Sequence, residues 1–544
     1  MRKAGFVLLT AAALTFSAEV LAASAPAPAP ASTAIVSTIA QSVNTTGLLS
    51  LLQGATANST LLGYSDSLAS LNITIPTNLS NSNALQEIAQ IAWEYISYPL
   101  PVLAKSLASV SLNGTAINTF SSRSNHLSVP SDNGLTPNHD TIYTQGWLDL
   151  SQGPQIVTVP SVSPSNRYWI VPFLDAYLNY YGAIGSDFNS SAGQYLVVGR
   201  SAAANATYGN FTSDRIFHSP TDLNWIIARV LVFNDSDTAA ALTYSGNITL
   251  TPYSTAINGS TNTTSKAAII SRAVNGSGYG TYGNQPGFLS GFSQQYPQWF
   301  NASAVYAETD PPANSTGLGA GSQGPVLSSL NSSASNATGL ASTAFQLGRQ
   351  VAITCILDAN NVSNVGLIAN GWTFHNNSGM YGSDYLLRAQ DTQTVIAALP
   401  PQQVIYFQTF VDSQNRTLDS SKGNNYTITF PLPLPAQAFW SLTLYNATSL
   451  NLINNTINRY TIGDRTSGLV YTGTNNNTLT IFVSASQPAV GTAEYANWLP
   501  APNNAPMFFL LRTYEPPAYV IAGNYAPPPF ILSTSTTPVA SAGK

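Results

Sequence analysis

The 544-residue sequence is poor in charge, and above all in lysine. Charged residues make up 8% of the chain, against about 25% in an ordinary globular protein. The 18 basic and 23 acidic side chains give a formal net charge of -5, and no basic run occurs. Nucleic acids and anionic membranes bind clusters of lysine and arginine, so the sequence argues against either as the main partner.

Cysteine and metal-ligand motifs are also scarce. Cys355 is the only cysteine, which excludes an intramolecular disulfide, and its apolar neighbours indicate a buried, inert thiol. No His-Glu-x-x-His zinc motif, Gly-x-Ser-x-Gly elbow or phosphate loop is present. The segment 319–324 fits a dinucleotide fingerprint literally, but it follows prolines and a glycosylation sequon where a strand is required. We therefore expect no metal and no cofactor.

The amino terminus has the pattern of a signal peptide. Arg2 and Lys3 precede an apolar run that ends at Phe16 and is too short to span a bilayer, and cleavage is expected after Ala22. A retained membrane anchor is the alternative. No later run is long enough to cross a membrane, so we expect a secreted protein, extracellular, periplasmic or at the cell surface.

Asparagine is abundant in this sequence, whereas charged residues are scarce. The chain contains 24 Asn-x-Ser/Thr sequons, and glycans on them would hydrate a surface that has only five lysines. The alternative is that a sequence rich in Asn, Ser and Thr forms sequons by chance. Representative predicted glycosylation sites are Asn44, Asn113, Asn205, Asn262, Asn336, Asn446 and Asn476.

The hydrophobic pattern predicts a mainly β protein with helical segments (α+β). Short β-rich runs separated by Pro, Gly and Asn fill two stretches, and helical periodicity occurs before and between them. Each stretch is expected to form an antiparallel β-sandwich or jelly roll. We predict a signal peptide at 1–22, a Pro/Ala-rich linker at 23–45, a helical lead-in at 46–126, a β-sandwich at 127–251, a helical and loop-rich connector at 252–401, a second β-sandwich at 402–519 and a tail at 520–544.

Several motifs carry a resemblance to known domains. The run 137–143, Pro-Asn-His-Asp-Thr-Ile-Tyr, and the motif around Trp147 resemble the domain of unknown function 1254. The runs 439–445, 462–465 and 497–500 resemble the domain of unknown function 1214. His139 and the sequon-rich filling between Asn258 and Asn336 depart from the family pattern. The resemblance implies two sandwiches joined by helices, often oligomeric, and no settled reaction.

The first motif also contains the residues best suited to chemistry. Asp140 with His139 as base, Tyr143 and Arg167 are the candidate catalytic residues, and a second carboxylate at Asp149 is available to bind a cation or a sugar hydroxyl. The structural alternative is that Asp140 and Asp149 only cap turns. The candidate ligand-binding residues are Asn138, Trp147, Asp149, Asp175, Arg459, Arg465 and Trp498.

Arginines in apolar surroundings need partners. Arg167, Arg459, Arg465 and Arg512 flank aromatic or aliphatic residues, and an unpaired buried guanidinium costs several kcal/mol. Each is expected to pair with a carboxylate, and the candidates are Asp140, Asp175, Asp464 and Glu515. Such pairs are structural, or they hold a substrate carboxylate or sugar between the two sandwiches.

Two classes of function remain. The first is a binding or structural glycoprotein that holds a glycan, a small polar ligand or a second copy of itself through its aromatic-rich sandwiches. The alternative is a hydrolase or lyase acting on a small polar or carbohydrate-like substrate. Asp140 and Asp149 within about 5 to 9 Å of each other would favour the enzyme, and a closed, hydrogen-bonded Asp140 would favour the binder. The low charge density also predicts a stability that varies little between about pH 3 and 7.

Overall fold

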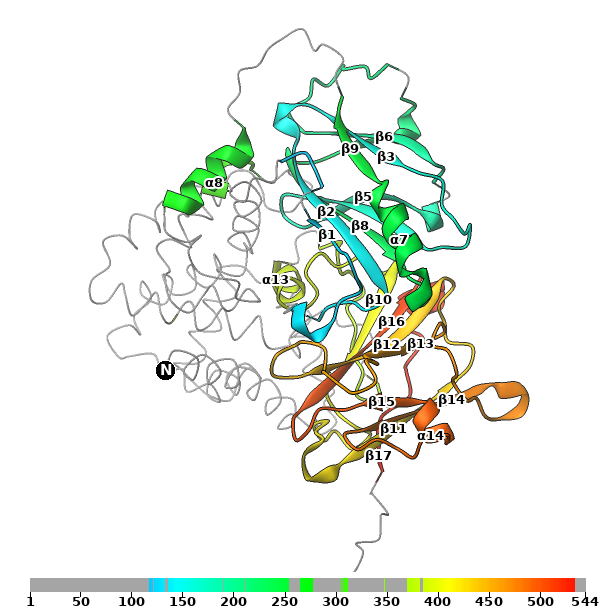
Figure 1. The fold of residues 1–544 in the computed structure, drawn as a ribbon. Helices are drawn as coiled ribbons and strands as arrows, with labels where there is room; N and C mark the ends of the chain where they lie inside the picture. The colour runs from blue at the N-terminus through cyan, green and yellow to red at the C-terminus, as the bar shows by residue number, and fades with distance from the viewer. Residues whose placement is uncertain are drawn as a thin grey trace, which may run out of the picture.

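The computed structural model describes residues 117–253, 265–276, 305–311, 347, 369–381 and 385–533, apart from 121, 133–135, 189, 210 and 307 (Figure 1). Within these ranges the chain forms four β-sheets and few helices. The mainly β fold class with two β-rich domains is thereby confirmed. The predicted signal peptide, linker and most of the helical lead-in and connector, with Cys355, lie outside the described residues.

The first domain consists of two facing sheets and helix α7. One sheet has the order β1-β2-β8-β4-β5 and the other β7-β6-β3-β9. Alternate residues of each strand point to opposite faces, so Ile142 and Leu148 of β2 enter the core between the sheets, whereas Tyr143 lies on the outer face. The bounds are β1 Ser122–Arg123, β2 Thr141–Asp149, β3 Gln155–Val159, β4 Trp169–Asp175, β5 Tyr180–Gly185, β6 Gly193–Val198, β7 Ile216–His218, β8 Leu223–Leu231, β9 Thr249–Pro252 and α7 Thr238–Gly246.

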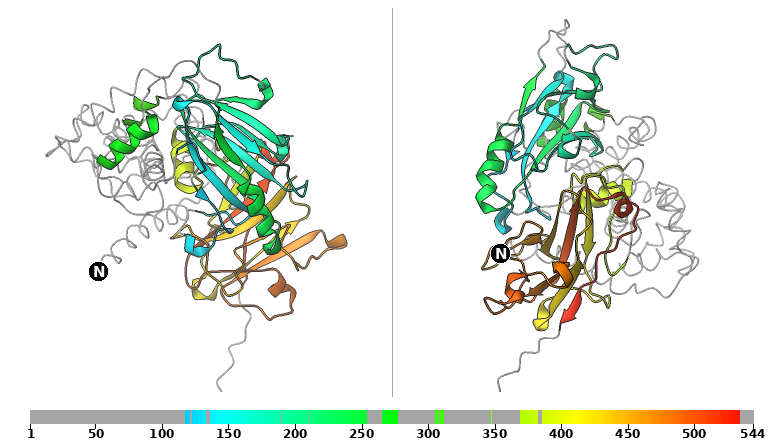
Figure 2. Two further views of the ribbon diagram at one scale, coloured as in Figure 1. Left: turned by 45° about the horizontal axis from the view of Figure 1, so that its top comes forward. Right: turned by 90° about the vertical axis from the view of Figure 1, so that its right-hand side faces the viewer.

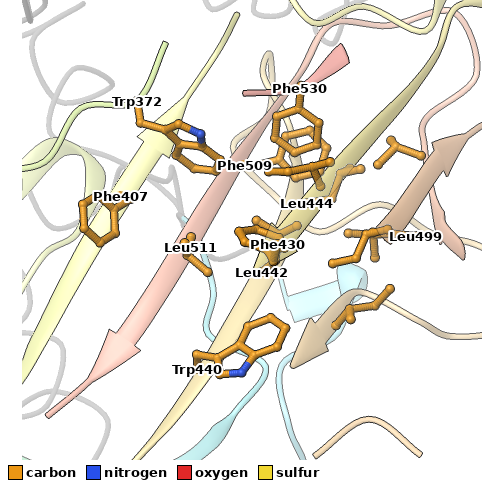
Figure 3. Close-up of a cluster of buried hydrophobic side chains, with 14 of the residues drawn as sticks. Trp372, Phe407, Phe430, Trp440, Leu442, Leu444, Leu499, Phe509, Leu511 and Phe530 are labelled. Atoms are coloured by element: carbon orange, nitrogen blue, oxygen red, sulfur yellow. The ribbon is translucent and has the colours of Figure 1, made fainter. Parts of the chain in front are cut away.

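The second domain repeats the two-sheet plan, with the orders β10-β16-β12-β13 and β15-β14-β11-β17. Its core is aromatic, and Figure 3 shows Trp372, Phe430 and Phe509 among the leucines between the sheets. The bounds are β10 Val404–Thr409, β11 Asn425–Pro431, β12 Phe439–Asn446, β13 Thr461–Gly463, β14 Thr478–Ser484, β15 Trp498–Pro500, β16 Met507–Tyr514 and β17 Ile531–Ser533.

The remaining helices are short. The α-helices are α8 Lys266–Gly276, α13 Tyr385–Thr394, α14 Ala493–Ala496 and α15 Ala518–Ile521. The 3-10 helices are η2 Pro130–Asp132, η3 Leu150–Gln152, η4 Ser186–Phe188, η5 Ser213–Arg215, η6 Asp235–Asp237, η10 Ser421–Gly423 and η11 Thr474–Asn476. No helix in the described ranges is long and apolar enough to cross a bilayer.

The sheets are not wholly antiparallel. Strand β7 pairs in parallel with β6, and β15 pairs in parallel with β14. Parallel neighbours require a crossover, and helix η5 and helix α14 lie in those two connections. The expectation of purely antiparallel sandwiches is corrected at these two edge pairs.

The two domains pack against each other through the outer faces of two sheets. In both views of Figure 2 the cyan-to-green first domain lies beside the yellow-to-red second domain. One apolar cluster includes Tyr168, Ile170 and Leu231 from the first domain with Phe439 and Tyr514 from the second. The rings of Phe439 and Tyr514 stack at 3.8 Å between centroids. The contact between the domains therefore buries apolar as well as polar side chains.

Candidate functional site

Asp140 lies directly before β2 and joins the two domains. Its Oδ1 accepts a hydrogen bond from Arg465 Nη2 at 2.7 Å, and its Oδ2 accepts one from Ser441 Oγ at 2.6 Å. The Asp140 side chain has no exposed surface. Asn138 Oδ1 accepts from the Asp140 amide at 2.6 Å, a turn that the Asn-His-Asp order favours. Both carboxylate oxygens are thus occupied by the second domain.

His139 is directed toward other groups. Its Nδ1 lies 2.6 Å from the Ser128 carbonyl oxygen, and its ring meets Tyr460 edge-on at 5.0 Å between centroids. Asp149 is at the far end of β2 from Asp140. Nine residues of strand separate the two carboxylates by about 30 Å. The structure therefore does not assemble the pair of carboxylates on which the hydrolase alternative rests.

Asp149 holds the start of α8. Its Oδ2 accepts hydrogen bonds from Ser265 Oγ at 2.6 Å and from the Ala267 amide at 3.1 Å. Its Oδ1 accepts from the Ser151 amide at 3.2 Å, which caps η3. All these contacts satisfy backbone or hydroxyl donors, as the turn-capping alternative requires.

Arg167 forms the predicted buried ion pair, with a partner that was not among the candidates. Its Nη1 and Nη2 each donate to Asp237 at 2.6 Å, and Nη1 also donates to the Leu231 carbonyl at 2.7 Å. Burial would raise the pKa of Asp237, but hydrogen bonds from Arg167 and from the Phe233 amide hold it below its ordinary value. Arg465 pairs as expected, with Asp140 and with Asp464.

Two other predicted residues, Asp175 and Trp147, contact neighbouring groups of the first domain. Asp175 Oδ1 accepts from the amides of Tyr177 and Asn179, each at 2.8 Å, and burial raises the pKa of its carboxyl. Trp147 stacks on Trp225 at 5.5 Å.

Arg459 and Trp498 close the end of α14. Arg459 Nη1 donates to the carbonyls of Ala496 at 2.9 Å and Trp498 at 3.0 Å, where the expectation was a carboxylate. Trp498 Nε1 donates to the Ser484 carbonyl at 2.9 Å. Carbonyls at a helix end lack partners within the helix, so a cation there is a common structural cap.

Two further buried arginines contact no carboxylate among the described residues. Arg229 lies on β8 opposite Tyr143 of β2, with its guanidinium 5.5 Å from that ring, and its Nη2 donates to the Ala397 carbonyl at 2.6 Å. Arg512 donates to Thr443 Oγ1 at 3.1 Å and to the Tyr445 hydroxyl at 2.9 Å. In both arginines Nε is buried and has no hydrogen-bond partner in the part of the chain that is described.

Tyrosines connect these two arginines. Tyr406 of β10 is the cross-strand partner of Arg512 of β16, its hydroxyl accepts a hydrogen bond from the Leu399 amide at 3.3 Å, and it interacts electrostatically with Arg229. Tyr514 accepts from Asn138 Nδ2 at 2.9 Å. The hydroxyl of Tyr168 is buried without a described partner. We call Tyr143, Tyr168, Arg229, Tyr406, Arg512 and Tyr514 the arginine–tyrosine cluster.

The protonation of the cluster follows from its burial. Desolvation raises the pKa of Tyr168 and of Tyr514 well above the ordinary value. The negative charge of Asp187 raises the pKa of Tyr168 further, and that of Asp140 raises the pKa of Tyr514 further. Both hydroxyls therefore stay neutral and can donate or accept hydrogen bonds. Two guanidinium groups with open Nε–H donors beside neutral hydroxyls can bind an oxygen-rich, negatively charged group.

Sequence reasoning overlooked part of this cluster. The sequence predicts Tyr143 as a site residue and Arg512 as a buried arginine with a carboxylate partner, which no described residue supplies. Tyr168, Arg229, Tyr406 and Tyr514 are not among its candidates. Arg229 stands within the apolar run 226–233 and is one of only 13 arginines, so the charge-scarcity reasoning applied to it equally. Among the described residues no three His, Cys, Asp or Glu side chains are placed to hold a metal ion.

Fold and site together define a protein of two β-rich domains tied through a buried polar junction. Residues 117–252 match the family described as Protein of unknown function (DUF1254), and residues 403–518 match Protein of unknown function (DUF1214). The two matched segments lie in the amino-terminal and carboxy-terminal order that the motifs indicated.

Two solved structures are similar to this chain. The VPA0106 protein from Vibrio parahaemolyticus is 19% identical, with a TM-score of 0.55, over 82% of this chain and 100% of that one. An uncharacterised protein from Burkholderia cenocepacia is 10% identical, with a TM-score of 0.38, over 90% of this chain and 98% of that one. The first likeness shows a shared fold. No curated protein matches the sequence significantly.

Proposed function

We propose that this protein is a secreted binding protein that holds a small polar ligand at the arginine–tyrosine cluster, between its two domains. The observation that carries the proposal is the state of Arg229 and Arg512, which are buried, lack a carboxylate among the described residues and keep an open Nε–H. Carbonyl and hydroxyl oxygens accept from their other nitrogens, but no carboxylate balances either buried charge, and burying an unbalanced charge is costly. A bound ligand with acceptor oxygens would remove that cost.

The same geometry favours binding over hydrolysis. Both oxygens of Asp140 are held by Ser441 and Arg465, so its carboxylate is not open to a substrate or a water molecule. His139 is directed at the Ser128 carbonyl. A general base has to reach the proton that it removes, and neither residue is so placed.

Secretion and glycosylation are part of the proposal. Sequon asparagines in the described ranges lie mostly at the surface, as glycan acceptors must. Asn446 is the least suitable, because it is half-buried and its Oδ1 accepts from the amides of Thr448 and Ser449. The exposed sequon asparagines are Asn205, Asn234, Asn247, Asn376, Asn415, Asn454 and Asn476, whereas Asn44, Asn113, Asn262 and Asn336 lie outside the described residues.

Expression of the full chain in a eukaryotic secretory host tests the glycan part. We expect the chain in the medium, with a mobility that increases after endoglycosidase treatment. Asn476→Gln should remove one glycan and Asn446→Gln none. Retention in the cell, or a mobility that the endoglycosidase leaves unchanged, would contradict the proposal.

A thermal-shift panel on the purified mature chain tests the binding part. The panel contains neutral sugars, sugar acids, hydroxy acids and amino acids. We expect at least one compound to raise the melting temperature of the wild-type protein and of Arg200→Met, which changes an exposed arginine, but not of Arg229→Met or Arg229→Lys. If no compound distinguishes the wild-type protein from the two Arg229 variants, the cluster is not a binding site.

A further inference from the structure

Lys266, at the start of α8, contacts two buried carboxylates. Its Nζ lies 2.7 Å from Asp222 Oδ2 and 2.8 Å from Asp310 Oδ1, and neither aspartate side chain has exposed surface. We propose that Lys266 and Asp310 join in an intramolecular amide (isopeptide) bond, with Asp222 as the base. The bond would give the protein a covalent cross-link within the chain, which its single cysteine cannot supply as a disulfide.

The start of α8 is fixed so that the amine is held at the two carboxylates. Asp149 Oδ2 accepts hydrogen bonds from Ser265 Oγ and from the Ala267 amide, the residues on either side of Lys266. A C–O bond of a carboxyl group is about 1.2 Å long, so Nζ lies within about 4 Å of the Asp310 carboxyl carbon. Two reacting groups held at this separation avoid the entropic cost of an encounter.

Backbone amides surround the Asp310 carboxyl group. Its Oδ2 accepts from the Leu223 amide at 2.6 Å and from the Asp222 amide at 3.0 Å. Two N–H donors on one oxygen stabilise the negative charge that develops there when an amine adds to the carboxyl carbon, as in an oxyanion hole. Oδ1, which contacts Lys266, is then the oxygen that leaves. The Tyr177 hydroxyl donates to the main-chain carbonyl of Asp310 at 2.9 Å and holds the backbone in place.

The two carboxyl groups differ in their affinity for a proton. Burial raises the pKa of Asp310, which favours the neutral acid that an amine attacks. Burial acts in the same way on Asp222, but hydrogen bonds from Lys266 and Ser201 hold its pKa below the ordinary value. Burial lowers the pKa of Lys266, and the two carboxylates more than offset this, so the amine is freed only when Asp222 takes its proton. That transfer makes the reaction slow, which is sufficient for a bond that forms once in each molecule.

The reaction balances without an external reagent. Asp222 takes one proton from the Lys266 ammonium group, and the free amine attacks Cγ of the neutral Asp310 carboxyl. The Nζ–Cγ bond forms and the Cγ–Oδ1 bond breaks. Asp222 passes its proton to the departing Oδ1–H group, which leaves as water, and takes a second proton from the nitrogen. The products are one amide, one water molecule and a neutral Asp222 carboxyl, with no change in oxidation state or total charge.

The surroundings of the cluster favour the amide once it has formed. Tyr177 and Tyr306 are fully buried beside it, and their rings meet edge-on at 6.3 Å between centroids. The Tyr306 hydroxyl donates to the Ala176 carbonyl at 3.0 Å, which fixes the segment 305–311 to the first domain. A site that excludes water protects the amide from hydrolysis. The bond would also close a loop between residues 44 positions apart, which lowers the entropy of the unfolded chain.

Intact-mass spectrometry of the full mature chain tests the proposal. The chain is produced in a host that adds no N-glycans, so that its mass depends on sequence and side-chain chemistry alone. We expect the wild-type mass to be below the sequence mass by one water molecule, about 18 Da. Lys422→Arg, at a lysine of η10, should show the same deficit. Lys266→Arg keeps the cation without forming the amide, and Asp222→Asn removes the base, so both should have their full sequence masses.

Peptide mapping by tandem mass spectrometry locates the bond. We expect one branched peptide that contains Lys266 and Asp310, and none in Lys266→Arg. A wild-type mass equal to the sequence mass overturns the proposal, and so does a deficit that persists in Lys266→Arg. A branch between Lys266 and Asp222 overturns Asp310 as the acceptor, and a deficit retained in Asp222→Asn overturns Asp222 as the base. No ligand is added, so these outcomes are independent of the arginine–tyrosine cluster.

Discussion

Replacing Arg167 by methionine measures what the buried ion pair contributes. The substitution keeps an unbranched apolar side chain and removes both 2.6 Å contacts to Asp237. Asp237 then keeps the Phe233 amide, which donates to its Oδ2 at 2.9 Å. The carbonyls of Leu231 and Ser163 also lose the donor that Arg167 supplies.

The expected cost follows from the burial of the two partners. Breaking a buried pair by removing one partner costs about 3 to 5 kcal/mol. The Arg167 side chain has no exposed surface, but that of Asp237 is 15% exposed and is reached by water. We therefore expect the low end, about 3 kcal/mol, as a lower urea midpoint with an unchanged slope at pH 7.

The pH dependence gives a second signature. Because the pKa of Asp237 is lower in the folded protein than in the unfolded chain, the stabilisation is present above the unfolded pKa and is lost as the pH falls through the folded one. The difference between wild type and Arg167→Met should therefore shrink below about pH 4. A cost under about 1 kcal/mol at pH 7, equal to that of the surface control Arg200→Met, would refute this reasoning.

Three other results are expected. Asp140→Ala should cost about 3 kcal/mol in urea unfolding, because Arg465 and Ser441 lose their shared acceptor, and a cost under about 1 kcal/mol would contradict this. Gly146→Ala should lower the melting temperature, since the new Cβ would lie 2.2 Å from the Thr119 carbonyl oxygen; an unchanged melting temperature would contradict this. Burial raises the pKa of five described carboxyls, so these groups stabilise the fold at low pH and lose that effect as the pH rises. Hydrogen bonds and cations lower the pKa of three others, which stabilise the fold at higher pH and lose that effect as the pH falls. Melting temperatures should thus change little between about pH 3 and 7, and a fall above about 15 °C at the acid end would contradict the balance.

The long strands could be predicted from the sequence, and the short ones could not. Strands β8 and β16, with nine and eight residues, lie within the stretches 127–251 and 402–519 in which β-rich runs predict strands. Strands β7, β13, β15 and β17 have three residues each, too few to show a period of two. The parallel pairing of β7 and β15 depends on crossovers through short helices and leaves no periodic signal.

The candidate site was predictable only where one sequence motif decides it. The turn formed by Asn138 and Asp140 is local, and its chemistry can be deduced from residue types. The partner of Arg167 is 70 residues away, in a 3-10 helix, and residue types alone do not select Asp237 over the other carboxylates. The closeness of Arg229 and Tyr406 arises from the packing of two domains, which no local pattern encodes.

The junction also gives a physical reason for the two domains to occur together. The outer sheet face of the first domain presents Tyr168, Ile170 and Leu231, and that of the second presents Phe439 and Tyr514. Either face alone would expose a large apolar patch and a guanidinium with an open Nε–H, which favours aggregation over solubility. Packing the faces together buries the patch, and the contact of Asp140 with Ser441 and Arg465 gives the pairing one specific geometry. A ligand that neutralises Arg229 and Arg512 would bind residues of both domains, so its binding should also stabilise the contact between them.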